Sequence, residues 1–319
     1  MPSSEHIHQY ELIELTDQGE WLSVYRARDT EHNQMVVLTL LRSDDTQLVE
    51  RFRQEAERLH TLHLPHTVPV RQVYAGSDAH YIVTDAPTGE SLAQRLARSG
   101  SMEVDDTLAI VSQVAEALDY AHKQGLVHGR VHPGSIFLDG KAVMLASASL
   151  VETIGASYAY MAPECLDAQQ AEQVDHRSDV YALACVVYEM LTGRPPFEGS
   201  EEEVLAAHQT QRPVPPRIHN PDLLPVLDAI LLKALAKRPQ SRYQTSGGLV
   251  AALREAVQEA QTRRMAGGGM FTGRIARDAK STRPVLITDS AGGIPTWVWI
   301  GAGIFIAVVI TLAILLATS

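Results

Sequence analysis

Residues 177–197, RSDVYALACVVYEMLTGRPPF, are the stretch that decides the fold. From Val180 to Leu191 apolar residues occur on nearly every side of a helical projection, which predicts a helix buried on all faces. Gly193, followed by Pro195 and Pro196, is typical of the end of such a helix. We therefore expect this helix in the middle of a domain.

The chain before this helix changes character near residue 87. Four short segments predict strands because they are rich in β-branched and aromatic residues: 10–15, 21–29, 34–41 and 79–87. Residues 46–62 have the apolar spacing of an amphipathic helix, with Glu55 on or beside its apolar stripe. Beyond residue 87 the periodicity is mainly helical, so a strand-rich part precedes a helical part.

Composition describes an ordinary globular protein rather than a disordered one. The 319 residues are 45% hydrophobic and 20% charged, and the net charge is -11. Because the body of the chain is acidic, no nucleic-acid partner is expected. Cys165 and Cys185 lie in apolar surroundings without metal-ligand spacing, and we interpret them as reduced packing residues.

The C-terminal region predicts a membrane tether. No charged residue follows Asp289, and only Thr311 interrupts the apolar run from Trp297 to Ala317. As a helix this run would be about 32 Å long, enough to cross a bilayer, so residues 295–317 are a predicted transmembrane helix. Arginines before the span favour a single-pass protein of the cell membrane with its body in the cytoplasm. A buried core helix is the alternative, but the run has no polar face.

The glycine-rich residues 263–294 carry scattered basic residues and no apolar period, which predicts a flexible juxtamembrane linker. Thr272, Ser281 and Thr282 lie near arginines, so a protein partner is expected, either an active kinase or a phospho-reader. Small residues at four-residue spacing in the span leave homodimer formation open as well.

Short motifs occur in a characteristic order over about residues 9–258. They are VYRARD, FRQEA, YIVTDAPTGESL, YMAPE, the RSDVY segment and KRPQSRY. In these motifs the chain resembles the Ser/Thr protein kinase domain, particularly that of bacterial membrane-anchored kinases. The resemblance implies an α+β, bilobal protein kinase-like fold, with a β-rich N-lobe at 9–87 and a helical C-lobe at 88–262. The linker and the transmembrane helix would follow.

Kinase chemistry relies on a glycine-rich loop over the phosphates and on a strand lysine, and this chain departs from the family at both. In DQGEWLSV, residues 17–24, only Gly19 and Val24 match the family, while Asp17 and Leu22 replace the outer glycines. This segment is either a degenerate phosphate loop or a plain hairpin turn. Thr39 stands at the lysine position, so Glu55 lacks its family partner and is expected to be exposed or paired with a nearby arginine such as Arg53 or Arg58.

The remaining chemical groups of the family are also replaced. Arg130 stands at the position of the catalytic base, and a guanidinium cannot accept a proton near neutral pH. His132 stands at the phosphate-binding lysine, while Ser135 and Ser147 stand at the two metal ligands. Because Mg²⁺ prefers carboxylate oxygens, we expect no metal site. ATP remains possible, because Gly19, Val24, Val37, Asp85, Ala86 and Pro87 could still enclose a nucleotide.

Residues that hold the family fold together are retained. Glu164 and Arg242 match a buried ion pair, Asp179 matches an acid that binds the catalytic-loop backbone, and His128 is expected to be structural. Loss of the chemical groups with retention of these four residues resembles a pseudokinase, which would serve as a signalling scaffold or allosteric binding module. A divergent kinase with weak phosphotransfer and a nucleotide-binding regulator without transfer are the alternatives.

Overall fold

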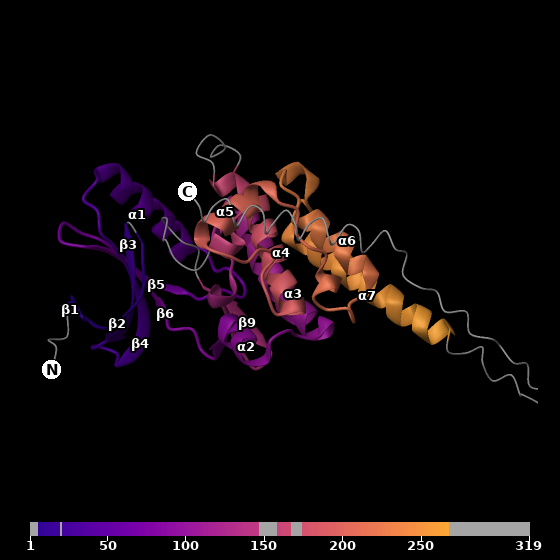
Figure 1. Cartoon of the computed structure of the whole chain (residues 1–319). Helices are drawn as coiled ribbons and strands as arrows, with labels where there is room; N and C mark the ends of the chain where they lie inside the picture. Colours follow the sequence, from indigo (N-terminus) through magenta and orange to yellow (C-terminus); the bar gives the residue numbers. More distant parts are fainter. Residues whose placement is uncertain (1–5, 20, 147–157, 167–173, 268–319) are drawn as a thin grey trace, which may run out of the picture. The chain divides into compact units, whose positions relative to one another are not determined.

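The computed structural model describes residues 6–19, 21–146, 158–166 and 174–267 (Figure 1). The predicted transmembrane helix, Ser147 and the linker from residue 268 onward lie outside the described residues. Within the described ranges, no helix combines the length and the apolar character that a membrane crossing requires.

The N-terminal part is built on a six-stranded antiparallel sheet with the order β1-β2-β3-β4-β6-β5. The strands are β1 His6–Ile7, β2 Tyr10–Gln18, β3 Leu22–Asp29, β4 Gln34–Leu41, β5 Val70–Ala75 and β6 His80–Asp85. The four predicted strands are therefore present, while β1 and β5 are not predicted from the sequence. Trp21, expected at the start of a strand, lies in the turn before β3.

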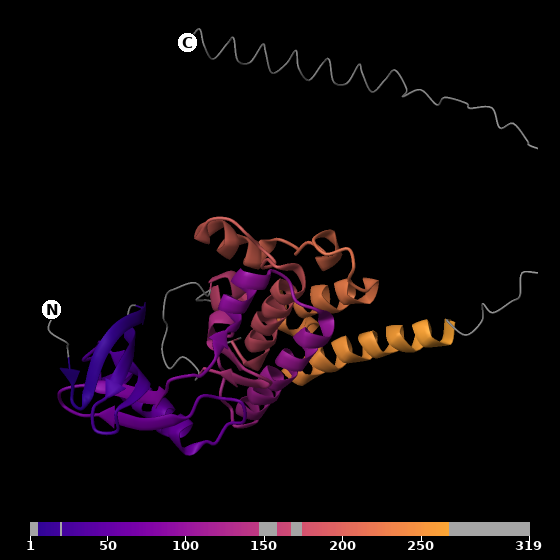
Figure 2. The same cartoon turned by 90° about the horizontal axis from the view of Figure 1, so that it is seen from below.

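One helix, α1 (Thr46–Thr61), packs on one face of this sheet. It begins at Asp45, whose carboxylate accepts hydrogen bonds from the backbone N–H groups of Gln47 and Leu48. Its buried residues meet Leu22, Leu41 and Ile82 of three neighbouring strands. The opposite face of the sheet has its own apolar cluster, which includes Leu38 and Tyr81. Figures 1 and 2 show this N-lobe in indigo beside the helical part of the chain.

The C-terminal part is helical apart from a small sheet of β7 (Glu90–Ser91), β8 (Ile136–Asp139) and β9 (Ala142–Leu145). Its helices are α2 Leu92–Ser99, α3 Val104–Lys123, α4 His176–Thr192, α5 Glu201–Thr210, α6 Pro225–Ala234 and α7 Ser246–Gly267. Short 3-10 turns include η1 (Pro133–Ser135) and η3 (Pro163–Leu166).

Helix α4 confirms the expectation drawn from its sequence. Of its 17 residues, 13 are buried, and it ends at Gly193, whose positive φ of 78° is the left-handed conformation that glycine favours. Helices α3, α6 and α7 contribute to the same apolar cluster around it. One boundary differs from expectation, because helical backbone in α7 continues to Gly267, past the predicted start of the linker at residue 263.

Candidate functional site

The β2–β3 hairpin is a tight turn that brings Asp17 toward the C-lobe. Gln18 pairs with Ser23 in the strand register, and the N–H of Gly19 donates to the carbonyl oxygen of Leu22 at 2.8 Å. A register shift between Leu15 and Asp17 interrupts the ladder just before the turn. The guanidinium of Arg42, which follows the last residue of β4, donates to the carbonyl oxygen of Gly19. The segment is therefore a β-hairpin, a structure that both interpretations of its sequence share.

Leu22 occupies the core rather than the cleft. Its side chain is 1% exposed and packs against Phe52 and Ala56 of α1. The strand register explains this, since Leu22 lies opposite Leu41 on the face of the sheet that α1 covers. The leucine at the position of a family glycine is thus a packing residue of the N-lobe.

Arg130 and Asp17 form an ion pair between the two lobes. Nη2 of Arg130 lies 3.4 Å from Oδ2 of Asp17, and the two side chains are 18% and 34% exposed. Burial lowers the pKa of Arg130, and the neighbouring Asp17 carboxylate opposes that effect. Nε of Arg130 is buried and has no hydrogen-bond partner among the described residues.

The backbone before Arg130 is held by Asp179, which is completely buried. Oδ2 of Asp179 accepts from the N–H of His128 at 2.8 Å, and Oδ1 accepts from the N–H of Gly129 at 2.7 Å. Nε2 of His122 donates to the same carboxylate at 2.7 Å. Gly129 has a φ of 73°, so the chain turns sharply between the anchored segment and Arg130.

His128 lies in the interior. Its Nε2 donates to the carbonyl oxygen of Ala146 at 2.9 Å, and its Nδ1 accepts from the N–H of Arg130 at 3.2 Å. Burial lowers the pKa of His128, which favours the neutral ring. Both ring nitrogens are used in contacts that shape the loop.

His132 and Ser135 are joined by hydrogen bonds between the Ser135 hydroxyl and the backbone of His132. The hydroxyl of Ser135 accepts from the N–H of His132 at 3.1 Å and donates to the carbonyl oxygen of the same residue at 2.8 Å. Ser135 is 6% exposed. Burial, together with the charge of Arg130, lowers the pKa of His132 to about 4, so its ring is neutral near pH 7. A neutral imidazole does not supply the charge of the family lysine.

Thr39 is half-buried on β4, opposite Val24 of β3 and Ile82 of β6. It lies on the sheet face that α1 covers, since residues directly opposite in a ladder share a face. Glu55 of α1 pairs with Arg51 at 3.5 Å. Local pairing of this acid was expected, but with a different arginine, because Arg53 binds Glu50 and Glu57 instead.

Of the residues predicted to enclose a nucleotide, Val24 and Val37 share one face of the sheet, while Asp85, Ala86 and Pro87 lie where the chain leaves it. Val24 and Val37 are half-buried on the same face of neighbouring strands. Asp85 is the half-buried last residue of β6, and the half-buried Ala86 and Pro87 follow it where the chain leaves the sheet. The carboxylate of Asp85 binds Arg71 of β5.

The residues at the family metal positions do not fit Mg²⁺. The hydroxyl of Ser135 is committed to His132, as described above, and Ser147 lies outside the described residues. Within the described ranges, no cluster of three or more His, Cys, Asp or Glu side chains has the geometry to hold a metal ion.

Glu164 and Arg242 form a fully buried, doubly hydrogen-bonded ion pair. The two nitrogen–oxygen distances are both 2.7 Å, and the side chains are 1% and 0% exposed. Burial by itself would raise the pKa of Glu164, but the hydrogen bonds and charge of Arg242, with the Ser178 hydroxyl, lower it overall. The pair joins η3 to the segment before α7.

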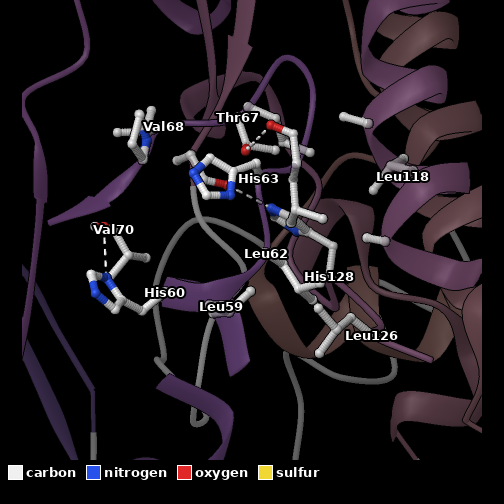
Figure 3. Close-up of a pocket in the computed structure, with 16 residues that line it drawn as sticks. Leu59, His60, Leu62, His63, Thr67, Val68, Val70, Leu118, Leu126 and His128 are labelled. Carbon is white, nitrogen blue, oxygen red and sulfur yellow. Dashed lines mark hydrogen bonds between the residues drawn. The ribbon is translucent and has the colours of Figure 1, made fainter. Parts of the chain in front are cut away.

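A separate cavity of about 160 Å³ lies between the end of α1, residues 62–70, α3 and the segment around His128 (Figure 3). Its walls are mainly aliphatic, with three histidines: His60, His63 and His128. His60 is turned to the carbonyl oxygen of Val70, at 3.0 Å from Nδ1. None of the residues predicted to enclose a nucleotide lines this cavity.

The sequence does not predict the contact between Asp17 and Arg130 or the bond from His122 to Asp179. For the first contact the sequence does contain a signal. Asp17 replaces a family glycine and Arg130 replaces a family acid, so two opposite charges appear at positions that face each other across the cleft. In the second case nothing local marks His122, which is one of 13 histidines.

An N-terminal antiparallel sheet with one helix, joined to a helical lobe built around a buried helix, defines the bilobal kinase fold. A family model described as the protein kinase domain matches residues 10–254. The chain therefore belongs to the protein kinase domain family, as its motifs predict.

Individual relatives are Ser/Thr kinases. The chain is 34% identical over 312 residues to serine/threonine-protein kinase PknE of Mycobacterium bovis, covering 90% of this chain and 54% of PknE. It is 34% identical over 277 residues to serine/threonine-protein kinase PknB of Mycolicibacterium smegmatis, covering 79% of this chain and 44% of PknB. The chain thus spans about half the length of these relatives.

Among solved structures, the crystal structure of Rad53 1-466 in complex with AMP-PNP is similar, with a TM-score of 0.64 and 21% sequence identity. The match covers 76% of this chain and 64% of that chain. This likeness supports the fold.

Proposed function

We propose that this protein is a membrane-tethered pseudokinase, a kinase-like domain that acts as a signalling scaffold or allosteric binding module. One observation carries the proposal: where the family has its catalytic base, Arg130 offers a guanidinium that is bound to Asp17 at 3.4 Å. A guanidinium cannot accept the proton of a substrate hydroxyl near neutral pH. Another candidate in this segment, His128, is buried with both ring nitrogens engaged.

Loss of the base is one of several losses. The strand lysine is replaced by Thr39, and the Ser135 hydroxyl at a metal position is bonded to His132. Single catalytic groups contribute on the order of a hundredfold or more to a rate. Their joint replacement leaves little phosphotransfer even when the effects are not additive. The relatives named as kinases support membership of the family, while the replaced residues support the loss of activity in this chain.

A regulator that binds a nucleotide without transferring phosphate is the second candidate. Val24 and Val37 favour it, because they are half-buried on one face of the sheet near the end of β6. Such a domain would use ATP as an allosteric ligand, with no requirement for Mg²⁺. Its partner would again be a protein, either an active kinase, a phospho-reader or a second copy of the chain.

The decisive experiment measures phosphotransfer and nucleotide binding on one preparation of the full chain in mild detergent. With γ-labelled ATP and Mg²⁺ or Mn²⁺, we expect no more label than in a heat-inactivated sample. The pseudokinase assignment is contradicted if label exceeds that blank and disappears in a Val37→Trp variant, whose indole fills the proposed adenine position.

The same samples separate the two non-catalytic candidates. A saturable rise in melting temperature with ATP, equal with Mg²⁺ and with a chelator, indicates an allosteric nucleotide site. An unchanged melting temperature at millimolar ATP indicates a scaffold that works without nucleotide. The Val37→Trp variant is again the matched control, because it should remove any shift.

A further inference from the structure

Compared with the family, position 17 has gained a negative charge and position 130 has changed from a negative to a positive charge. A neutral glycine position has become an acid, and an acid position has become a base, 113 residues apart in the chain. Either change alone would be unfavourable, since Arg130 is largely buried and an unpaired buried charge is costly. Together the two changes give a neutral pair.

Each partner is held in place by its own lobe. In the N-lobe, the turn is closed by the bond from Gly19 to Leu22 and by the guanidinium of Arg42 on Gly19. In the C-lobe, Asp179 anchors the two residues before Arg130. The ion pair thus connects two segments whose backbones are each held by hydrogen bonds within their own lobe.

Other contacts join the lobes elsewhere. The N–H of Val68 donates to the carbonyl oxygen of Leu145 at 2.9 Å. The N–H of Leu145 donates to the carbonyl oxygen of His66 at 2.7 Å. Arg58 of α1 donates to the carbonyl oxygen of Gln124. These contacts involve the segment before β5 and the end of α1, whereas Asp17 lies on the hairpin that, in the family, covers the phosphates.

We propose that Asp17 and Arg130 form an interlobe latch that keeps the hairpin closed on the catalytic-loop segment when no nucleotide is bound. In catalytic family members this closure is supported by phosphates and metal ions, whereas here the protein supplies both charges itself. An anionic ligand entering the cleft has to compete with the Asp17 carboxylate for Arg130. The latch goes beyond the proposed function and does not depend on it, because it concerns the ligand-free protein.

Amide hydrogen exchange of the full chain, without nucleotide, tests the latch. In Asp17→Asn we expect exchange in residues 126–135 to rise by about two- to tenfold, although the substitution is in the other lobe. In Arg130→Gln we expect the reciprocal rise in residues 17–24. The double variant should exchange no faster than the faster single variant, since both changes break one interaction.

Glu14→Gln is the matched control. It removes a carboxylate from the same strand, where Glu14 pairs with Arg26 at 3.5 Å within the N-lobe. This variant should leave residues 126–135 at the wild-type rate. The latch is wrong if Asp17→Asn leaves residues 126–135 at the wild-type rate, or if the effects of the two single variants add.

A charge reversal keeps the test decisive if Arg130→Gln fails to fold. Asp17→Arg places two guanidinium groups together at a hairpin position that is 34% exposed, and it should open the hairpin more than Asp17→Asn does. Adding Arg130→Asp should restore slow exchange. Failure of the reversed pair to slow exchange relative to Asp17→Arg alone overturns the latch, and neither result bears on phosphotransfer.

Discussion

Two ion pairs of this protein show how burial decides the role of a charged side chain. The side chains of Glu164 and Arg242 are at most 1% exposed, and the carboxylate of Glu164 also accepts a hydrogen bond from the Ser178 hydroxyl at 2.7 Å. Arg242 additionally donates to the carbonyl oxygens of Ala236 and Lys237. With its hydrogen bonds satisfied, this pair fixes the fold, whereas the Asp17–Arg130 pair is partly open to water and can be broken at lower cost.

Replacing Glu164 by Gln should therefore lower the free energy of unfolding by about 3–5 kcal/mol, because Arg242 is left as a buried charge without its counterion. Urea unfolding followed by circular dichroism measures the change. The matched control is Glu259→Gln, which breaks an exposed pair with Arg263 at 3.2 Å and should cost below about 1 kcal/mol.

Acid should reduce the difference between wild type and Glu164→Gln. The pKa of Glu164 is lower in the folded protein than its usual value, so its stabilisation is present above the unfolded pKa and is lost as pH falls through the folded pKa. An equal cost of the substitution at neutral pH and well below that pKa would contradict this account.

At the scale of elements, the β2–β3 hairpin combines two roles that its sequence does not separate. Its Leu22 end belongs to the core under α1, and its Asp17 side belongs to the cleft. Alternation along the strands does not explain the division, because Asp17 pairs with Val24, two residues from Leu22, so both lie on the face that α1 covers. Their different positions along the hairpin separate the two roles. Restoring a family glycine at position 22 would therefore remove core packing.

Leu22→Ala is expected to lower the free energy of unfolding by about 2–4 kcal/mol, the usual cost of truncating a buried leucine. Leu15→Ala is the control from the same hairpin, because Leu15 is 46% exposed and should cost below about 1 kcal/mol. Equal losses for both variants in urea unfolding would mean that Leu22 is not a core residue.

At the scale of the whole molecule, the apolar run from Trp297 to Ala317 leads us to propose membrane attachment. After cell lysis, we expect the full chain in the membrane fraction even after an alkaline wash, and a chain ending at residue 294 in the supernatant. The truncated chain keeps the basic linker, so it distinguishes the apolar span from electrostatic attraction. Full-length protein in the supernatant would contradict the proposal.

Much of the fold could be predicted because local patterns carry it. Helix α4, helix α1 and four of the N-lobe strands follow from apolar spacing, and the family follows from motif order. Strand β5 and the end of α7 are less marked, because VRQVYA alternates weakly and the helix continues into glycine-containing sequence. At the site, the retained Glu164, Arg242 and Asp179 make the contacts that the family resemblance implies.

The sequence alone determined which chemical groups are present, since an arginine at position 130 and a threonine at position 39 carry their chemistry in any fold. Only the tertiary structure decided which groups meet. Asp17 finds Arg130 across 113 residues, and Leu22 turns into the core instead of toward a ligand. Such pairings depend on strand register and on how two lobes close, and neither is encoded in a short window of sequence.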